Sequence, residues 1–157
     1  MNYDRVVLRH LGGGAVAQLE ELAGSVEREV ANATTRSAAR MLDLLLREEG
    51  SVKPGDALGL SVTDRDTLLA AVYARTYGDR IDSTVQCRQC GNRYDMNFSL
   101  AELQRAVGLH GAPVPAVRAT SKGVEYRVPT GRDELAVEAL GHSAARELRR
   151  RIAPAGQ

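Results

Sequence analysis

The stretch that decides the fold runs from Thr63 to Leu100 and reads TDRDTLLAAVYARTYGDRIDSTVQCRQCGNRYDMNFSL. Its first part predicts a helix that Thr63 caps, with Asp66 reaching back three residues on, and that Gly78 ends. Apolar side chains recur along one face of this helix, so we expect that face to lie in the core and to pack on sheet. They are Leu68, Leu69, Val72, Tyr73 and Tyr77.

After Gly78 the sequence twice alternates apolar with polar residues, which predicts the two strands of a hairpin. The alternating positions are Ile81, Ser83 and Val85 in the first run and Tyr94, Met96 and Phe98 in the second. Cys87-Arg88-Gln89-Cys90-Gly91 forms the turn between them. Ser99 to Glu102 matches a capping box, so another helix begins there.

The metal-ligating candidates are Cys87 and Cys90, at the turn of this hairpin. Two thiolates three positions apart, followed by a glycine that permits a tight turn, make half of a tetrahedral zinc site. The chain has no other cysteine, and His10, His110 and His142 have none of the spacings of two-Cys, two-His sites. Bound zinc and a bare structural turn both remain open. A redox dithiol fits less well, because a strand follows the pair where a thioredoxin-like dithiol has a helix.

Composition excludes several function classes. The 157 residues carry 21 basic and 20 acidic side chains, a formal net charge of +1, so no global field would collect nucleic acid or anionic lipid. With no Trp and a single Phe, the core must be aliphatic and a stacking platform for bases or sugars is not expected. The sequence has no apolar run near the length of a membrane span, so we expect a protein of the cytoplasm with no membrane partner.

Residues 1–57 are expected to form an N-terminal helical segment. Val6 to Leu8 could form a strand but is too brief to assign firmly. A helical stripe from Val16 to about Ala31 precedes a second one that begins at Ala38 and runs up to Gly50. Gly12 to Gly14 is interpreted as a flexible loop before the first helix. The same run has the form G-x-G-x-x-A of a dinucleotide-binding fingerprint, but a predicted helix stands where that fingerprint needs a second strand.

The rest of the chain is expected to form two further parts, a helix plus the Cys-x-x-Cys hairpin over 58–108 and a hairpin plus C-terminal helix over 109–157, with 58–157 as one unit. The second hairpin pairs Val117–Thr120 with Val124–Val128, and the last helix is capped by Thr130 and broken at Gly141. The fold class predicted is therefore α+β, with a zinc-ribbon-like knuckle hairpin at its centre.

No catalytic residue is predicted. Gly141-His142-Ser143 resembles a nucleophile elbow, but it lacks a preceding strand and the acid and histidine that should follow. Acidic pairs such as Asp64 and Asp66 are interpreted as solvated helix ends. Arg149 to Arg151 are interpreted as cations that stabilise a helix C-terminus rather than as a binding patch.

The order of three motifs along the chain resembles that of a known protein family. The motifs DRDxLLxxxYxxxYGDR, CxxC and PTGRDxL follow one another between Leu58 and Leu148. In that order they resemble a family of baseplate-associated proteins of tailed phages and phage-tail-like contractile injection systems, similar to baseplate-hub assembly proteins. The resemblance implies no catalytic residues.

In that family the chain commonly continues with a second Cys-x-x-Cys, which would complete a zinc ribbon with the pair that matches Cys87 and Cys90. This sequence lacks that second pair. The resemblance implies a non-enzymatic structural or assembly factor of a contractile tail-like particle, with baseplate or hub proteins as partners. The alternative is a stand-alone zinc-ribbon-like adaptor that binds a protein or nucleic acid, and a dithiol oxidoreductase is a remote third. A small-molecule ligand is not expected.

Overall fold

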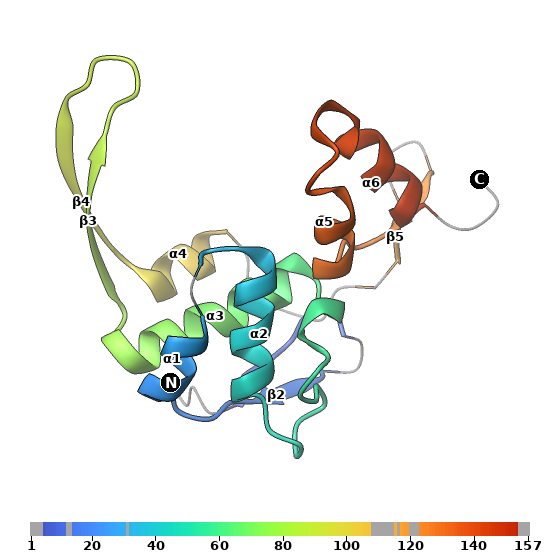
Figure 1. The fold of residues 1–157 in the computed structure, drawn as a ribbon, viewed down its shortest axis with the longest axis horizontal. Helices are drawn as coiled ribbons and strands as arrows, with labels where there is room; N and C mark the ends of the chain where they lie inside the picture. The colour runs from blue at the N-terminus through green and yellow to red at the C-terminus, as the bar shows by residue number, and fades with distance from the viewer. Residues whose placement is uncertain are drawn as a thin grey trace.

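The computed structural model describes residues 5–11, 14–30, 32–107, 115, 117–119 and 123–153. Short antiparallel hairpins alternate with helices, as an α+β protein requires (Figure 1). The elements are β1 Arg5–Val7, β2 Val16–Gln18, α1 Gly24–Glu29, α2 Thr35–Leu45, η1 Ala57–Gly59, α3 Val62–Tyr77, β3 Arg80–Gln86, β4 Arg93–Ser99, α4 Leu100–Ala106, β5 Val117–Ala119, β6 Glu125–Arg127, α5 Gly131–Val137, η2 Gly141–Ser143 and α6 Ala144–Ile152.

The N-terminal segment is not purely helical, which corrects the prediction for residues 1–57. β1 pairs antiparallel with β2, with Val6 opposite Ala17, and helix begins only at Gly24. Alternate side chains of the two strands are buried, and this pairing overrides the helical spacing of the same apolar residues. Gly12 and Gly13, which belong to the predicted loop, lie outside the described residues. A strand, β2, stands where a dinucleotide site needs a helix N-terminus.

The free edge of β2 is covered by the chain that follows α2. The Ser51 amide donates to the Val16 carbonyl at 2.7 Å, and the Arg47 amide donates to the Gln18 carbonyl at 3.0 Å. Gly50 lies so close to β2 that an added Cβ would meet the Gln18 nitrogen at 3.0 Å. Only glycine therefore fits at this position without a backbone shift.

The buried apolar core comes from the first half of the chain. Its members are Val6, Leu8, Ala17, Leu19, Ala39, Leu42, Leu45, Leu46, Val52, Ala57, Leu60, Leu68, Ala71 and Val72. Helix α3 thus packs against β1 and α2, and the expectation that it packs on the sheet of the later hairpins is wrong. On its predicted face Leu68 and Val72 are buried, Leu69 and Tyr73 are partly buried, and Tyr77 is 62% exposed.

The ends of the helices follow local signals, with two corrections. Ser61 rather than Thr63 caps α3, since its hydroxyl accepts from the Asp64 amide at 3.0 Å. Gly78 ends α3 with a φ of +88°, as predicted. Ser99 caps α4 as predicted. The carboxylate that binds the first turn of α4 belongs to Asp79 and not to Glu102, because the Ala101 amide donates to Asp79 Oδ1 at 2.7 Å.

The second hairpin and the broken C-terminal helix are confirmed. β5 pairs antiparallel with β6, and Thr130 begins α5 with its amide donating to Asp133 Oδ2 at 3.0 Å. Gly141, with a φ of +50°, separates α5 from α6. Thr120, which the prediction placed at the end of the first strand, and Ser121 and Lys122, which it placed at the turn, lie outside the described residues.

Candidate functional site

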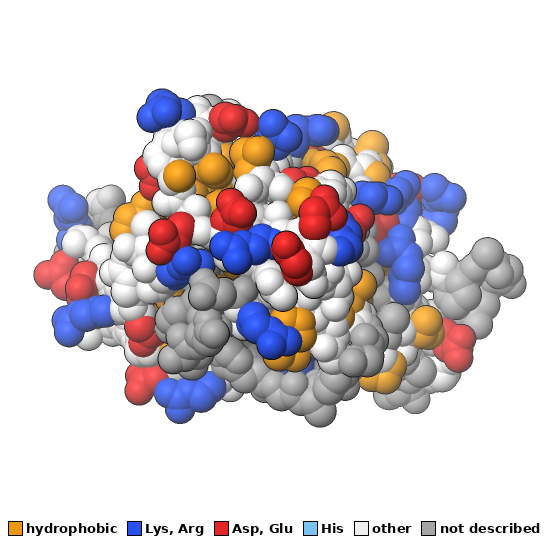
Figure 2. Space-filling model, turned by 90° about the horizontal axis from the view of Figure 1, so that it is seen from below, with side chains coloured by type: hydrophobic (Ala, Val, Ile, Leu, Met, Phe, Trp, Pro, Cys, Tyr) orange, Lys and Arg blue, Asp and Glu red, His pale blue; other side chains and the backbone are white. Residues whose placement is uncertain are grey.

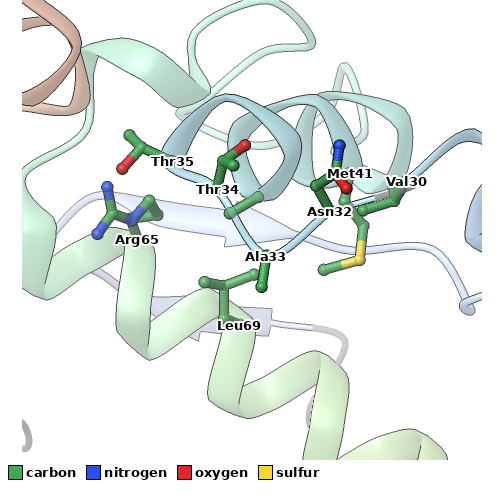
Figure 3. Close-up of a pocket in the computed structure, with 9 residues that line it drawn as sticks. Val30, Asn32, Ala33, Thr34, Thr35, Met41, Arg65 and Leu69 are labelled. Carbon is green, nitrogen blue, oxygen red and sulfur yellow. The ribbon is translucent and has the colours of Figure 1, made fainter. Parts of the chain in front are cut away.

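A shallow apolar groove runs between α1, α2 and α3. Two adjoining hollows of about 410 and 510 Å³ share Val30, Met41 and Leu69 and form what we call the helix groove. The apolar side chains that line it are Leu22, Val30, Ala33, Ala38, Met41, Leu69, Val72, Tyr73 and Tyr77. Figure 3 shows Leu69 of α3 facing Ala33 and Met41 across one of these hollows.

Polar groups at the two ends of the helix groove already have partners. At one end Arg65 pairs with Glu134, and the Thr35 hydroxyl donates to the same carboxylate at 3.2 Å. At the other end the Tyr77 hydroxyl donates to Glu27 at 3.1 Å, and this bond raises the pKa of Tyr77. Apart from Asn32, Thr34 and Thr35, the lining between these ends is apolar, which suits the side chains of another protein better than a polar substrate.

The DRDxLLxxxYxxxYGDR motif of α3 and the PTGRDxL motif of α5 contact each other beside this groove. The Gly131 amide donates to the Leu60 carbonyl at 3.2 Å, and Arg65 of α3 reaches Glu134 of α5. An added Cβ on Gly131 would lie 3.3 Å from the Leu58 carbonyl oxygen, a tight contact that favours glycine at this position. The two motifs therefore act together to fix α5 on the body of the protein.

Asp64 is buried, at 1% exposure, and its interpretation as a solvated helix end is wrong. Its carboxylate accepts from the Arg9 amide at 2.7 Å and from the His10 amide at 3.1 Å. Asp64 thereby ties the turn after β1 to the first turn of α3. No local pattern predicts this role, because the two amides that bind Asp64 lie 54 and 55 positions away.

The buried carboxylate of Asp133 is the centre of a second cluster of hydrogen bonds and ion pairs. Arg127 donates to both carboxylate oxygens, at 2.5 and 2.7 Å, and Arg151 Nε donates to one of them at 3.3 Å. Hydrogen bonding from Arg127, opposed by burial and aided by Thr130, lowers the pKa of Asp133 well below its ordinary range. Arg150 pairs with Glu147. The Arg150–Glu147 pair lies within α6, whereas Arg151 of the same basic run links α6 to Asp133 of α5 through an ion pair.

The Cys-x-x-Cys turn closes the long hairpin as predicted. The Cys87 amide donates to the Asn92 carbonyl at 2.8 Å, and the Gly91 amide donates to the Cys87 carbonyl at 2.9 Å. Gly91 has a φ of +76°, which suits glycine. Both thiols are free, and main-chain N–H groups of Cys90 and Gln89 face the Cys87 sulfur and lower the pKa of that thiol.

Within the part of the chain that the structure describes, no group of three or more His, Cys, Asp and Glu residues is placed to hold a metal ion. His10 lies beside α3 and His142 lies in η2, whereas His110 is outside the described residues. The two thiols fit zinc in their chemistry and spacing, but they supply only two of the four ligands of a structural site. The zinc-ribbon character of the hairpin stays a prediction.

The β3–β4 hairpin extends away from the helices (Figure 1). Its register places Ser83 opposite Met96 and Val85 opposite Tyr94, so the alternating apolar side chains share one face. Near the Cys-x-x-Cys turn this face is open to solvent, with Tyr94 53% and Met96 40% exposed. It is a second candidate docking surface.

Surface charge does not single out a nucleic-acid site on the face that Figure 2 shows. Acidic and basic side chains are interspersed there, with apolar side chains between them. Among the described residues, no helix combines the length and the apolar character that crossing a membrane requires.

Comparison with known proteins gives one family. The model of the family described as T4 bacteriophage base plate protein matches residues 23–138. No curated protein and no solved structure matches the chain. The matched segment contains all three motifs together with α2 and every groove residue except Leu22, so the resemblance read from the motifs is confirmed. This chain belongs to the T4 bacteriophage base plate protein family.

Proposed function

We propose that the protein is a non-enzymatic structural or assembly factor of a contractile phage-tail-like particle and binds baseplate or hub proteins through the helix groove. The observation that carries this proposal is the unfilled apolar middle of the groove, lined by Met41, Leu69 and Tyr73. Membership of a base plate protein family supports a protein partner. The protein is then associated with the particle or its assembly in the cytoplasm.

The shape of the groove favours an amphipathic helix as the part of the partner that docks. Three helices form its walls, and Met41 offers a side chain that adapts to different apolar shapes. A helix would place apolar residues at i, i+3 or i+4 and i+7 along such a groove. Arg65, Glu134, Tyr77 and Glu27 at the groove ends are already paired, so the contact gains mainly from apolar burial.

The test is co-migration on a sizing column with baseplate proteins encoded beside this chain, followed by a measured Kd. Leu69→Glu places a charge in the groove and should weaken binding about tenfold or more. Tyr77→Ala removes a mostly exposed side chain at the groove end and should weaken binding without unfolding the chain. The matched control is Leu140→Glu, which changes an exposed leucine outside the groove. Equal affinity of all three variants for the baseplate partner would overturn the proposal.

The second candidate function is a zinc-ribbon-like adaptor that binds a protein or nucleic acid in regulation. The free thiols of Cys87 and Cys90 at the hairpin turn favour it. The same purified chain separates the two functions. A nucleic-acid mobility shift at physiological salt, without binding to baseplate proteins, would support the adaptor.

A further inference from the structure

Cys87 and Cys90 lie at the turn that joins β3 to β4, the end of the hairpin farthest from the helices (Figure 1). Hydrogen bonds fix this turn. The main-chain bonds between Cys87 and Asn92 and between Gly91 and Cys87 close it, and Gln86 Nε2 donates to the Gly91 carbonyl at 3.1 Å. The two cysteines therefore share one hydrogen-bonded turn at a place that another molecule can approach, with Cys90 exposed and Cys87 partly buried.

This arrangement makes half of a zinc site. Structural zinc takes four protein ligands in a tetrahedron, and thiolates are preferred donors. The described residues hold no third His, Cys, Asp or Glu placed to complete a cluster with the pair.

We propose that a second copy of this chain completes the site, so that one zinc ion joins two hairpin turns through Cys87 and Cys90 of each copy. Two identical turns related by a two-fold axis supply four thiolates without any further residue. Each thiol loses its proton on binding, and the centre of one Zn²⁺ and four thiolates carries a net charge of −2.

Two features of the hairpin fit this partner. Arg88 within the turn and Arg93 just after it are exposed, so two copies bring four cations to the rim of the anionic centre. The exposed apolar face beside the turn, with Val85, Tyr94 and Met96, would be covered by the same face of the second hairpin. Charge and apolar surface thus both favour a second copy of the hairpin.

The experiment uses the full chain in a reducing agent that does not bind metal, with and without added zinc. Elemental analysis gives zinc per chain, and light scattering gives the mass. We expect one zinc ion per two chains, a mass of two chains, and return to a single chain when a chelator removes the metal. Cobalt in place of zinc should give the strong thiolate charge-transfer absorption of a four-sulfur site.

Variants make the test specific. Cys87→Ser and Cys90→Ser should each remove both zinc and the second copy while the circular dichroism spectrum stays unchanged. Gln89→Ala, which alters an exposed side chain of the same turn, is the matched control and should keep both. Tyr94→Ser should keep zinc in the dimer but weaken association about tenfold, since it removes apolar contact.

Several outcomes would overturn the proposal. One zinc per single chain that survives the chelator would place the remaining ligands within the chain. A dimer that persists in chelator would show that metal does not join the copies. Zinc bound only when a baseplate protein is present would assign the second pair of ligands to that protein. Because docking at the helix groove is measured separately, either proposal can fail while the other stands.

Discussion

Asp133→Asn is the substitution that tests the C-terminal ion-pair cluster most directly. The wild-type carboxylate accepts from both nitrogens of the Arg127 fork, from Arg151 Nε and from the Thr130 amide, and its side chain is 2% exposed. Asparagine keeps the shape but not the charge, so it retains at most part of this set. Hydrogen bonds to charged groups contribute about 1.5–3 kcal/mol each in buried settings.

The expected loss is smaller than the sum of these bonds. The Arg127 and Arg151 side chains are 41% and 35% exposed, so water solvates them when the carboxylate is removed. We expect Asp133→Asn to lower the free energy of unfolding by about 2–4 kcal/mol. For a chain of this size that corresponds to a fall in Tm of about 6–12 °C.

The dependence on pH gives a second, independent signal. The folded pKa of Asp133 is lowered by Arg127, so the ionised carboxylate stabilises the folded state above the unfolded pKa of about 3.9. This stabilisation is lost as pH falls through that value toward the folded pKa. The difference between wild type and Asp133→Asn should thus be constant from about pH 5 to 8 and shrink below about pH 4.

Urea denaturation followed by circular dichroism at several pH values measures both quantities. Glu138→Gln, at an exposed position just after the same helix, is the matched control and should change stability by less than about 0.5 kcal/mol. A difference between wild type and Asp133→Asn below about 0.5 kcal/mol at pH 7, or one unchanged at pH 3, would refute the assigned role of this carboxylate.

Two further predictions concern the core and its close contacts. Leu68→Ala should cost about 2–5 kcal/mol, whereas Leu69→Ala in the helix groove should cost about 1 kcal/mol, because only Leu68 is fully buried; equal losses in urea melts would contradict this. Gly50→Ala should cost about 1–3 kcal/mol, because its Cβ would meet the Gln18 nitrogen at 3.0 Å; an unchanged melting curve would show that the backbone shifts without strain.

The sequence by itself determined those features whose causes lie a few residues apart. Gly78 ends α3 because a glycine can adopt a positive φ, and the Cys-x-x-Cys-Gly turn forms between two alternating runs. Ser99 and Thr130 begin helices because their side chains and neighbours satisfy free amides of the first turn. Cys87 and Cys90 could be predicted as half of a zinc site in the same way, since both lie within one turn, and this site stays a prediction.

The tertiary structure decided what depends on contacts between distant residues. β1 and β2 are three residues long, too short to outweigh a helical pattern, and they persist because they pair with each other and with the chain after α2. Asp64 is buried by amides more than fifty positions away, and the helix groove needs three helices side by side. Periodicity in one segment cannot show these features, because their free energy comes from surfaces that meet only when the chain has folded.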